Sequence, residues 1–477
     1  MAASCIDGGA LPDRGHDGGL RPKGRSGSAP FQRRFGTGRI GSQRAGCIGF
    51  IDEMTLPGSP QIAYRGGRLF VEDCAVEDLV RAHGSPLYVY SRASMLAALG
   101  GYQRALKGRD HLICYAMKAN SNLAVLQVFA RAGCGFDIVS AGELERALVA
   151  GARASDIVFS GVGKQREEMR RALQAGVLCF NVESEGELRV LSAVAQETGL
   201  TARISLRVNP DVDAGTHPYI STGLRNNKFG IPHKDAVDAY RLASTLPGLE
   251  IVGIDCHIGS QITAVGPYLD ALDRLLDLIE AVESQRVSVP HIDLGGGLGI
   301  AYADELPPSA EDLMRALLDR IDVRGHGHRK ILVEPGRSVV GNAGLLASEV
   351  LFVKHAEEKS FCIVDAAMND LMRPAMYDAW MDIVECRVRA DVDAVRYDVV
   401  GPICESGDWL GRERLLRVRP GDLIAVLSAG AYCMSMASNY NSRGRAAEIL
   451  VSGSEAWLVR EREASEALFA HERLLPG

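Results

Sequence analysis

The sequence has no C-x-x-C pair, and beyond its first 53 residues it has no block of lysine and arginine interleaved with aromatic residues. The first absence argues against a structural zinc site or a redox dithiol, so we expect no metal. The second absence, together with a formal net charge of −7, argues against nucleic acid as a partner. A composition of 47% hydrophobic and 24% charged residues is ordinary for a globular protein, so we expect neither a membrane protein nor a fibre.

Cysteine is present but shows no pairing pattern. Eleven cysteines are scattered along the chain, several of them within apolar, strand-like runs. A cysteine in such a run acts as a small hydrophobic residue. The odd count, the expected burial and the lack of a signal peptide predict a reducing environment and therefore a cytoplasmic protein.

The texture of the sequence changes along the chain. Residues 1–53 are rich in Gly, Ser and Arg and lack periodicity, so we expect a disordered extension that is dispensable or precedes the biological start at Met54. Residues 91–340 alternate apolar strand-like runs with amphipathic helices. Residues 341–477 hold shorter β-like segments, which predict a mainly β C-terminal domain of sandwich-like or barrel-like form. The strand-like residues 54–90 are expected to join that domain.

The alternating stretch contains eight strand-like runs. Strands that alternate with helices predict a parallel sheet, and eight units without a long interruption favour a (β/α)8 barrel over an open doubly wound sheet. The predicted fold class is therefore α/β. The expected barrel strands span residues 113–118, 135–139, 157–160, 178–182, 204–208, 251–256, 291–294 and 331–334.

Polar residues stand at the carboxyl ends of these runs, where a parallel barrel gathers its catalytic groups. They are Lys118, Asp137, His257, the turn 295–297 and Glu334. The first and eighth strands are neighbours in a closed barrel, so Lys118 and Glu334 are expected to share one pocket. Burial of Lys118 is expected to lower its pKa and leave a nucleophilic amine.

Each of these signals has a plain structural alternative when it is taken alone. Lys118 fits a surface lysine, Glu334 fits a Pro-Gly turn, and His257 fits a structural histidine. Pyridoxal phosphate (PLP) would give all of them a role: the glycines let a phosphate approach the backbone, Glu334 meets the pyridine nitrogen, and His257 stacks on the ring. Their shared position at one end of the barrel favours the functional interpretation.

Six motifs carry a resemblance to a known family. They are YAMKAN at 115–120, HIGSQ at 257–261, GGG at 295–297, EPGR at 334–337, CESGD at 404–408 and GAY at 430–432. In order and spacing they resemble the alanine-racemase-like barrel PLP decarboxylases, and within these the diaminopimelate decarboxylase branch. The resemblance runs from about residue 60 to 460. It implies a PLP-dependent enzyme that converts meso-diaminopimelate to L-lysine and CO2 at the end of lysine biosynthesis.

The resemblance also implies a role for each matched residue. It makes Lys118 the lysine that forms a Schiff base with PLP, His257 the residue that stacks on the ring, and Cys404 the acid that protonates the substrate carbon after CO2 leaves. The implied cofactor-binding residues are Lys118, His257, Ser260, Gly296, Gly297, Glu334, Gly336, Arg337 and Tyr432. The implied substrate-binding residues are Arg337, Arg373, Tyr377, Glu405 and Tyr432. The segment of Cys404 and Glu405 is expected to reach the partner subunit's site, which implies a homodimer with shared active sites.

The choice of substrate has a physical argument. Diaminopimelate carries a distal carboxylate beside a distal ammonium group, and this requires a cationic clamp as well as an acid. Arg337, Arg373 and Glu405 supply these groups. Alternatives are a decarboxylase of ornithine, arginine or a carboxylated polyamine such as carboxynorspermidine. From another class comes a non-catalytic PLP-binding regulatory protein. A racemase is disfavoured, because racemase relatives place arginine where Glu334 stands.

Overall fold

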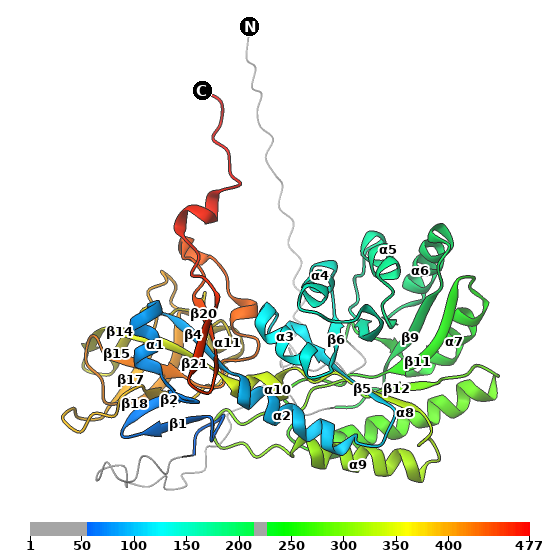
Figure 1. Ribbon diagram of the computed structural model, residues 1–477, viewed down its shortest axis with the longest axis horizontal. Helices are drawn as coiled ribbons and strands as arrows, with labels where there is room; N and C mark the ends of the chain where they lie inside the picture. The colour runs from blue at the N-terminus through cyan, green and yellow to red at the C-terminus, as the bar shows by residue number, and fades with distance from the viewer. Residues whose placement is uncertain (1–54, 214–226) are drawn as a thin grey trace, which may run out of the picture. The chain divides into compact units, whose positions relative to one another are not determined.

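The computed structural model describes residues 55–213 and 227–477 (Figure 1). The predicted disordered extension over residues 1–53 and the proposed start at Met54 lie outside the described residues. The described residues belong to one compact unit, and their elements include a parallel barrel and mixed β-sheets.

Eight parallel strands close the barrel, so the predicted (β/α)8 fold is confirmed. The last strand pairs with the first, with Val333 opposite Ile113. The strands are apolar because they are buried on both faces. In barrel order they are β5 (His111–Ala116), β6 (Gly135–Ile138), β7 (Ile157–Phe159), β8 (Cys179–Val182), β9 (Ala202–Asn209), β11 (Leu249–Asp255), β12 (His291–Asp293) and β13 (Lys330–Val333), and the short β10 (Ile231–Pro232) pairs with β9.

Helices connect these strands, and their start signals lie in the sequence. Ser140 and Ser184 accept hydrogen bonds of 3.2 Å from the backbone N–H groups of Glu143 and Glu187, respectively. These side-chain caps satisfy free N–H groups at the start of each helix, so the helices begin directly after Ser140 and Ser184. The main helices of this region are α2 (Arg92–Ala105), α3 (Leu123–Arg131), α4 (Ala141–Val149), α5 (Arg166–Ala175), α6 (Glu185–Thr198), α7 (Ala236–Thr245), α8 (Gly266–Ser284) and α9 (Ala310–Val323).

The first barrel strand, His111–Ala116, lies two residues earlier in the chain than the predicted span 113–118. It ends at Ala116, and Met117–Ala119 forms a turn of 3-10 helix, η2, that carries Lys118. The Ala116 N–H group bonds to the carbonyl of Pro335, and a proline has no N–H group to continue the ladder. Lys118 therefore lies on a turn above the barrel end rather than within a strand.

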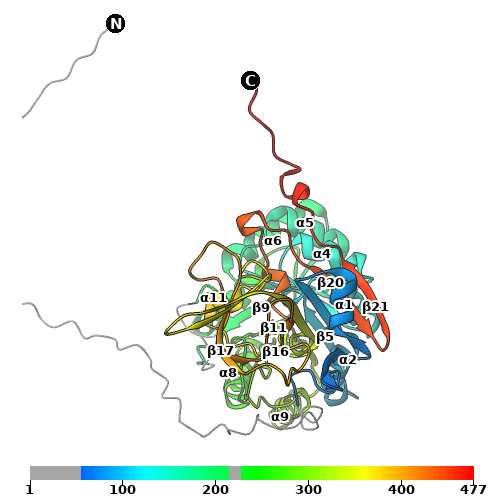
Figure 2. The same cartoon turned by 90° about the vertical axis from the view of Figure 1, so that its left-hand side faces the viewer.

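The mixed β-sheet joins both ends of the described chain. Strand β4 (Leu87–Ser91) pairs antiparallel with β14 (Gly344–His355) and parallel with β20 (Ala447–Ser452). Strand β21 (Glu455–Arg460) pairs with β20 and lies beside it in Figure 2. Further strands are β15 (Ser360–Val364), β16 (Ile383–Glu385), β17 (Val395–Val400), β18 (Trp409–Leu416) and β19 (Leu423–Val426), with a small sheet of β1 (Ile62–Arg65), β2 (Arg68–Val71) and β3 (Cys74–Ala75). We propose that the domain boundaries lie near residues 91 and 341.

Three further α-helices are short. Helix α1 (Val76–His83) precedes β4, α10 (Arg337–Val340) follows β13, and α11 (Arg373–Tyr377) follows β15. Helix α10 begins directly after Gly336, where an added Cβ atom would lie 3.2 Å from the Cβ of Ala116. The absence of a side chain at Gly336 thus allows α10 to approach the end of β5.

Candidate active site

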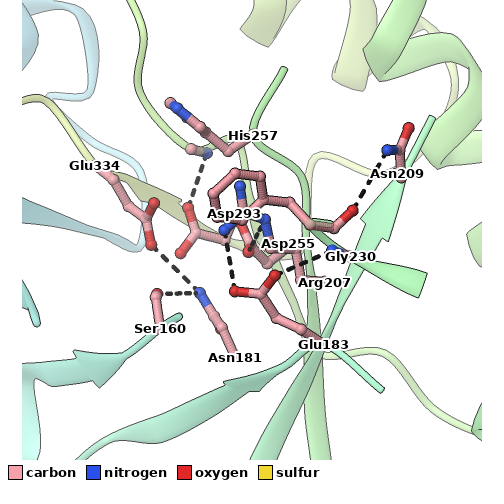
Figure 3. A network of polar contacts seen from close by, with 12 residues as sticks. Ser160, Asn181, Glu183, Arg207, Asn209, Gly230, Asp255, His257, Asp293 and Glu334 are labelled. Atoms are coloured by element: carbon pink, nitrogen blue, oxygen red, sulfur yellow. Dashed lines mark hydrogen bonds and ion pairs between the residues drawn. The ribbon is translucent and has the colours of Figure 1, made fainter. Parts of the chain in front are cut away.

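The barrel interior has an apolar layer with a polar layer beyond it. Leu112, Cys114, Val158, Cys179, Val252 and Leu332 form a separate buried cluster. Residues two positions apart on a strand face the same side, so Ser160, Asn181 and Glu334 follow Val158, Cys179 and Leu332 on the inner face. Figure 3 shows the polar layer, with Arg207, Asp255 and Asp293 among its members.

Lys118 meets an acid from the neighbouring strand. Its Nζ donates a hydrogen bond of 2.7 Å to Oδ2 of Asp137 in β6. Burial lowers the pKa of Lys118, but the charges of Asp137 and Glu334 outweigh this effect and raise the pKa above its ordinary value. The prediction of a lowered pKa is therefore wrong. It considered burial without the counter-charge that the next strand supplies.

His257 is fixed by the glycine turn. The Gly296 N–H group donates a hydrogen bond of 3.1 Å to Nδ1 of His257. Burial and the charges of Arg207 and Lys118 hold the pKa of His257 well below its ordinary value. The imidazole is therefore neutral and accepts this bond at Nδ1. Its flat apolar faces suit stacking against an aromatic ring.

The turn after β12 has no room for side chains. A Cβ atom added to Gly296 would lie 2.1 Å from the carbonyl oxygen of Glu334. A Cβ atom added to Gly297 would lie 2.2 Å from the carbonyl oxygen of Gly259. Gly297 also has a φ of 101°, which L side chains rarely adopt. Glycine at these positions lets a bound group approach the backbone closely. The Gly296 N–H group already bonds to His257, so of these two glycines Gly297 is the one that offers its N–H group to an anion.

Glu334 lies in a group of buried acids. One oxygen atom from each of Asp255, Asp293 and Glu334 lies within 4.8 Å of the others. Burial and the nearby charges of Asp137 and Asp293 raise the pKa of Glu334 well above its ordinary value, and burial raises that of Asp293 to about 7. These acids therefore hold protons that separate carboxyl groups in water would lose.

Two polar side chains support this acid group. Asn181 Nδ2 donates a hydrogen bond of 3.3 Å to Glu334 Oε1 (Figure 3). Arg207 Nη1 lies 3.2 Å from Glu183 Oε1, and Arg207 Nε lies 3.8 Å from Asp255 Oδ2. The Arg207 charge thus compensates part of the buried negative charge.

Arg337 is packed among hydroxyl and aromatic groups. Its Nη2 donates a hydrogen bond of 3.0 Å to Ser260 Oγ, and its Nη1 bonds to the Tyr302 hydroxyl. Its guanidinium carbon lies 4.7 Å from the ring centre of Tyr432. The Tyr432 N–H group donates a hydrogen bond of 2.8 Å to the carbonyl of Ala119, so this ring is attached to the turn that carries Lys118.

Arg373 is the second buried cation of the site. Its guanidinium carbon lies 5.2 Å from the ring centre of Tyr302 and 5.8 Å from that of Tyr377. Its Nε is buried and has no hydrogen-bond partner among the described residues. Within residues 55–213 and 227–477, neither Arg337 nor Arg373 forms an ion pair with a carboxylate. Buried cations of this kind require an anion.

Cys404 and Glu405 have other neighbours. Cys404 is exposed, and its N–H group donates a hydrogen bond of 2.9 Å to Asn441 Oδ1. Glu405 Oε2 accepts a hydrogen bond of 3.5 Å from the Tyr440 hydroxyl. Outside their own loop these two residues thus bond to residues 440 and 441, whereas the other predicted site residues gather around Lys118 and Arg337.

Several residues of the site were missed by the sequence reasoning. Asn181, Arg207, Asp255, Asp293 and Tyr302 belong to it through the contacts given above. The first four carry a usable signal, because each is a polar residue near the carboxyl end of an apolar strand. Tyr302 lies on the loop after β12, where no periodicity marks it.

Together these groups form a suitable site for PLP. Lys118 offers an amine for an aldehyde, and His257 offers a neutral flat ring. Gly297 and Arg337 offer N–H groups for a phosphate, and Glu334 offers a buried carboxyl group for a pyridine nitrogen. The structure brings these groups to the same end of the barrel strands.

Comparison with known proteins agrees with this chemistry. Residues 92–341 match the family model of the pyridoxal-dependent decarboxylase, pyridoxal binding domain. The chain is 57% identical to diaminopimelate decarboxylase of Pseudomonas fluorescens over 414 residues, which cover 87% of this chain and 99% of that relative. It is 45% identical to the Aquifex aeolicus diaminopimelate decarboxylase over 412 residues, 85% of this chain and 96% of that one.

Solved structures show the same likeness. The Helicobacter pylori diaminopimelate decarboxylase complexed with L-lysine matches with a TM-score of 0.79 and 40% identity, and the match covers 83% of this chain and 98% of that chain. The M. jannaschii diaminopimelate decarboxylase in complex with L-lysine matches with a TM-score of 0.84 and 36% identity, and covers 88% and 99%. The barrel, the site and these relatives together place the chain in the diaminopimelate decarboxylase family of pyridoxal-dependent decarboxylases.

Proposed function

We propose that the protein removes CO2 from meso-2,6-diaminopimelate and releases L-lysine, the last step of lysine biosynthesis. Family membership confirms the predicted PLP-dependent decarboxylase. The observation that carries the substrate assignment is the buried Arg373, whose Nε has no partner among the described residues. A substrate with a distal carboxylate would supply the missing anion.

Each residue around the barrel end is assigned to one part of PLP. When bound, PLP supplies an electron sink for the electron pair left on the substrate carbon after CO2 departs. We assign Lys118 to covalent attachment of the cofactor and His257 to its ring face. We assign Glu334 to the pyridine nitrogen, because its raised pKa favours a proton held between the two groups. Gly296, Gly297, Ser260 and Tyr432 are assigned to the phosphate, and Gly336 lets α10 carry Arg337 to the same place.

The distal end of the substrate is assigned to the two arginines. Arg373 would receive the distal carboxylate between the rings of Tyr302 and Tyr377, with Arg337 beside it. Glu405 is assigned to the distal ammonium group. A diamine precursor without a distal carboxylate would leave Arg373 buried and unpaired, which is costly.

We further propose that the protein works as a homodimer. Cys404 and Glu405 contact residues 440 and 441 in their own chain. Cys404 is exposed, so it is available to a second subunit. In this arrangement Cys404 donates a proton to the carbon that has lost CO2 in the partner subunit's site.

We also propose a cytoplasmic location. The nine cysteines in the described part of the chain are free, as in a reducing compartment. No described helix has the length and apolar character needed to cross a membrane.

The test is release of CO2 and formation of L-lysine from meso-diaminopimelate by the PLP-loaded protein. L-ornithine, L-arginine and carboxynorspermidine are assayed in parallel. Turnover of diaminopimelate alone would support the assignment. Turnover of only one of the other substrates would agree with a PLP-dependent decarboxylase and would contradict the role assigned to Arg373.

A non-catalytic PLP-binding protein is the alternative from another class. The same assay separates the two, because such a protein would bind PLP and release no CO2 from any of the four substrates. Lys118→Ala provides the second test, since full turnover in a variant that cannot attach PLP would contradict the mechanism.

A further inference from the structure

Tyr302 connects the two buried arginines. Its hydroxyl accepts a hydrogen bond from Arg337 Nη1, and the guanidinium carbon of Arg373 lies 5.2 Å from the centre of its ring. Tyr302 itself is 3% exposed. One side chain thus touches both cations, through its hydroxyl group on one side and its π system on the other.

The two arginines differ in their hydrogen bonds to the protein. Arg337 bonds to the hydroxyl groups of Ser260 and Tyr302 and lies over the ring of Tyr432. The guanidinium group of Arg373 lies near the rings of Tyr302 and Tyr377, and its Nε has no hydrogen-bond partner among the described residues. Arg337 is therefore held in place, whereas the position of Arg373 depends on the rings of Tyr302 and Tyr377.

The backbone beside Tyr302 is also fixed. Gln261 exchanges two hydrogen bonds with Ile300, at 2.7 and 3.1 Å. The carbonyl of Ala301 accepts a hydrogen bond of 2.9 Å from Asn342, and the N–H group of Tyr302 donates one of 2.9 Å to Glu305. These bonds fix the backbone at Tyr302, while burial and the bond to Arg337 restrict its ring, so the ring is a rigid support for a guanidinium group.

We propose that Tyr302 is a positioning residue that gives the site its preference for a ligand with a distal carboxylate. Its ring holds Arg373 by a cation–π contact, and its hydroxyl group is fixed by Arg337. Arg373 then presents its N–H groups without losing rotamer freedom when the carboxylate arrives. This inference rests on the proposed function, because it assumes that Arg373 receives the distal carboxylate.

Two substitutions of Tyr302 distinguish the effect of its ring from the effect of its hydroxyl group. Tyr302→Leu removes both, so KM for meso-diaminopimelate should rise about 5- to 30-fold with kcat nearly unchanged. Tyr302→Phe keeps the ring and loses the bond to Arg337, so KM should rise only about 2- to 5-fold. Tyr240→Phe is the matched control, because it removes a buried hydroxyl bond of 2.8 Å to Gly253 elsewhere in the barrel. This control should leave KM unchanged.

Binding of two ligands tests the same point without turnover. L-lysine carries a carboxylate, and 1,5-diaminopentane is the same chain without it. Calorimetry on the PLP-loaded protein should show weaker L-lysine binding in Tyr302→Leu than in the wild type, by a similar factor. The affinity for 1,5-diaminopentane should stay the same. Equal losses for both ligands, or a loss of kcat with KM unchanged, would overturn the proposal and leave Tyr302 a purely structural residue.

A double-mutant cycle shows whether Tyr302 acts through Arg373. In an Arg373→Ala background, Tyr302→Leu should change L-lysine affinity far less than it does in the wild type. Additive effects would overturn the proposal. Absence of diaminopimelate turnover in the wild type would refute the proposed function alone, since the ligand comparison would still decide the role of Tyr302.

Discussion

Lys118, on the turn that follows β5, forms an ion pair with Asp137 of β6, with 2.7 Å between Nζ and Oδ2. The pair keeps the lysine protonated, because the Asp137 charge raises its pKa against the opposite effect of burial. Only a neutral amine attacks an aldehyde, so this acid opposes the attachment of PLP.

The Asp137→Asn variant tests this relationship. Removal of the negative charge should lower the pKa of Lys118, so PLP attachment should be half-maximal at a lower pH than in the wild type. The shift is measured by the absorbance of bound PLP over a pH series. Asp156→Asn, which removes a carboxylate paired with Arg153, is the control and should cause no shift. An unchanged midpoint in Asp137→Asn would show that Asp137 does not control the lysine.

A mixing experiment tests the shared active site. Lys118→Ala and Cys404→Ala should each be nearly inactive in the assay of CO2 release. Random reassembly of equal amounts should restore about a quarter of the wild-type activity, because half of the dimers then hold one complete site. Activity that stays at the level of the separate variants, despite confirmed subunit exchange, would place Cys404 in the site of its own chain or outside catalysis.

Arg373→Ala should weaken binding of the distal carboxylate of the substrate. Loss of one charge-assisted clamp costs about 1.5–3 kcal/mol, or roughly 10- to 150-fold in kcat/KM for diaminopimelate. The loss should lie mainly in KM, and bound PLP should keep its absorbance spectrum. Arg396→Ala, on the exposed position of β17, is the control. An effect confined to kcat would argue for a role near the reacting carbon instead.

The acid group makes stability depend on pH. Burial raises the pKa of Asp293 from 3.8 to about 7, so the folded protein keeps this proton at pH values where the unfolded chain has lost it. Stability from this group is fully present below the ordinary pKa and decreases as the pH rises to about 7. Asp293→Asn cannot lose a proton and should escape this decrease.

The measurement is urea unfolding of the two proteins freed of PLP, at about pH 4 and about pH 8. The stability of Asp293→Asn relative to the wild type should be higher at the upper pH. The amide can still accept the bond that Gly295 N–H donates to Asp293 Oδ1 at 2.9 Å. A constant difference between the two pH values would mean that Asp293 ionises normally.

Much of the barrel follows from the sequence, because period and length identify parallel strands. Lys118 and Glu334 were expected together since the first and eighth strands of a barrel are neighbours, and β5 pairs with β13. The pKa of Lys118 was mispredicted because it depends on Asp137, a residue of another strand. Tyr302 was missed because contacts between loop side chains leave no periodic trace in the sequence.

The placement of β4 has a consequence for biosynthesis. Its residue Tyr90 bonds through its hydroxyl group to Glu448, which lies 358 positions later in the chain. A ribosome releases the barrel strands long before it releases residues 447–452 of β20. The barrel can therefore assemble while one edge of β4 still lacks its neighbour, and the mixed sheet closes only after nearly the whole chain has been translated. A nascent chain stalled before residue 447 should keep that strand edge open to chaperones or to other chains.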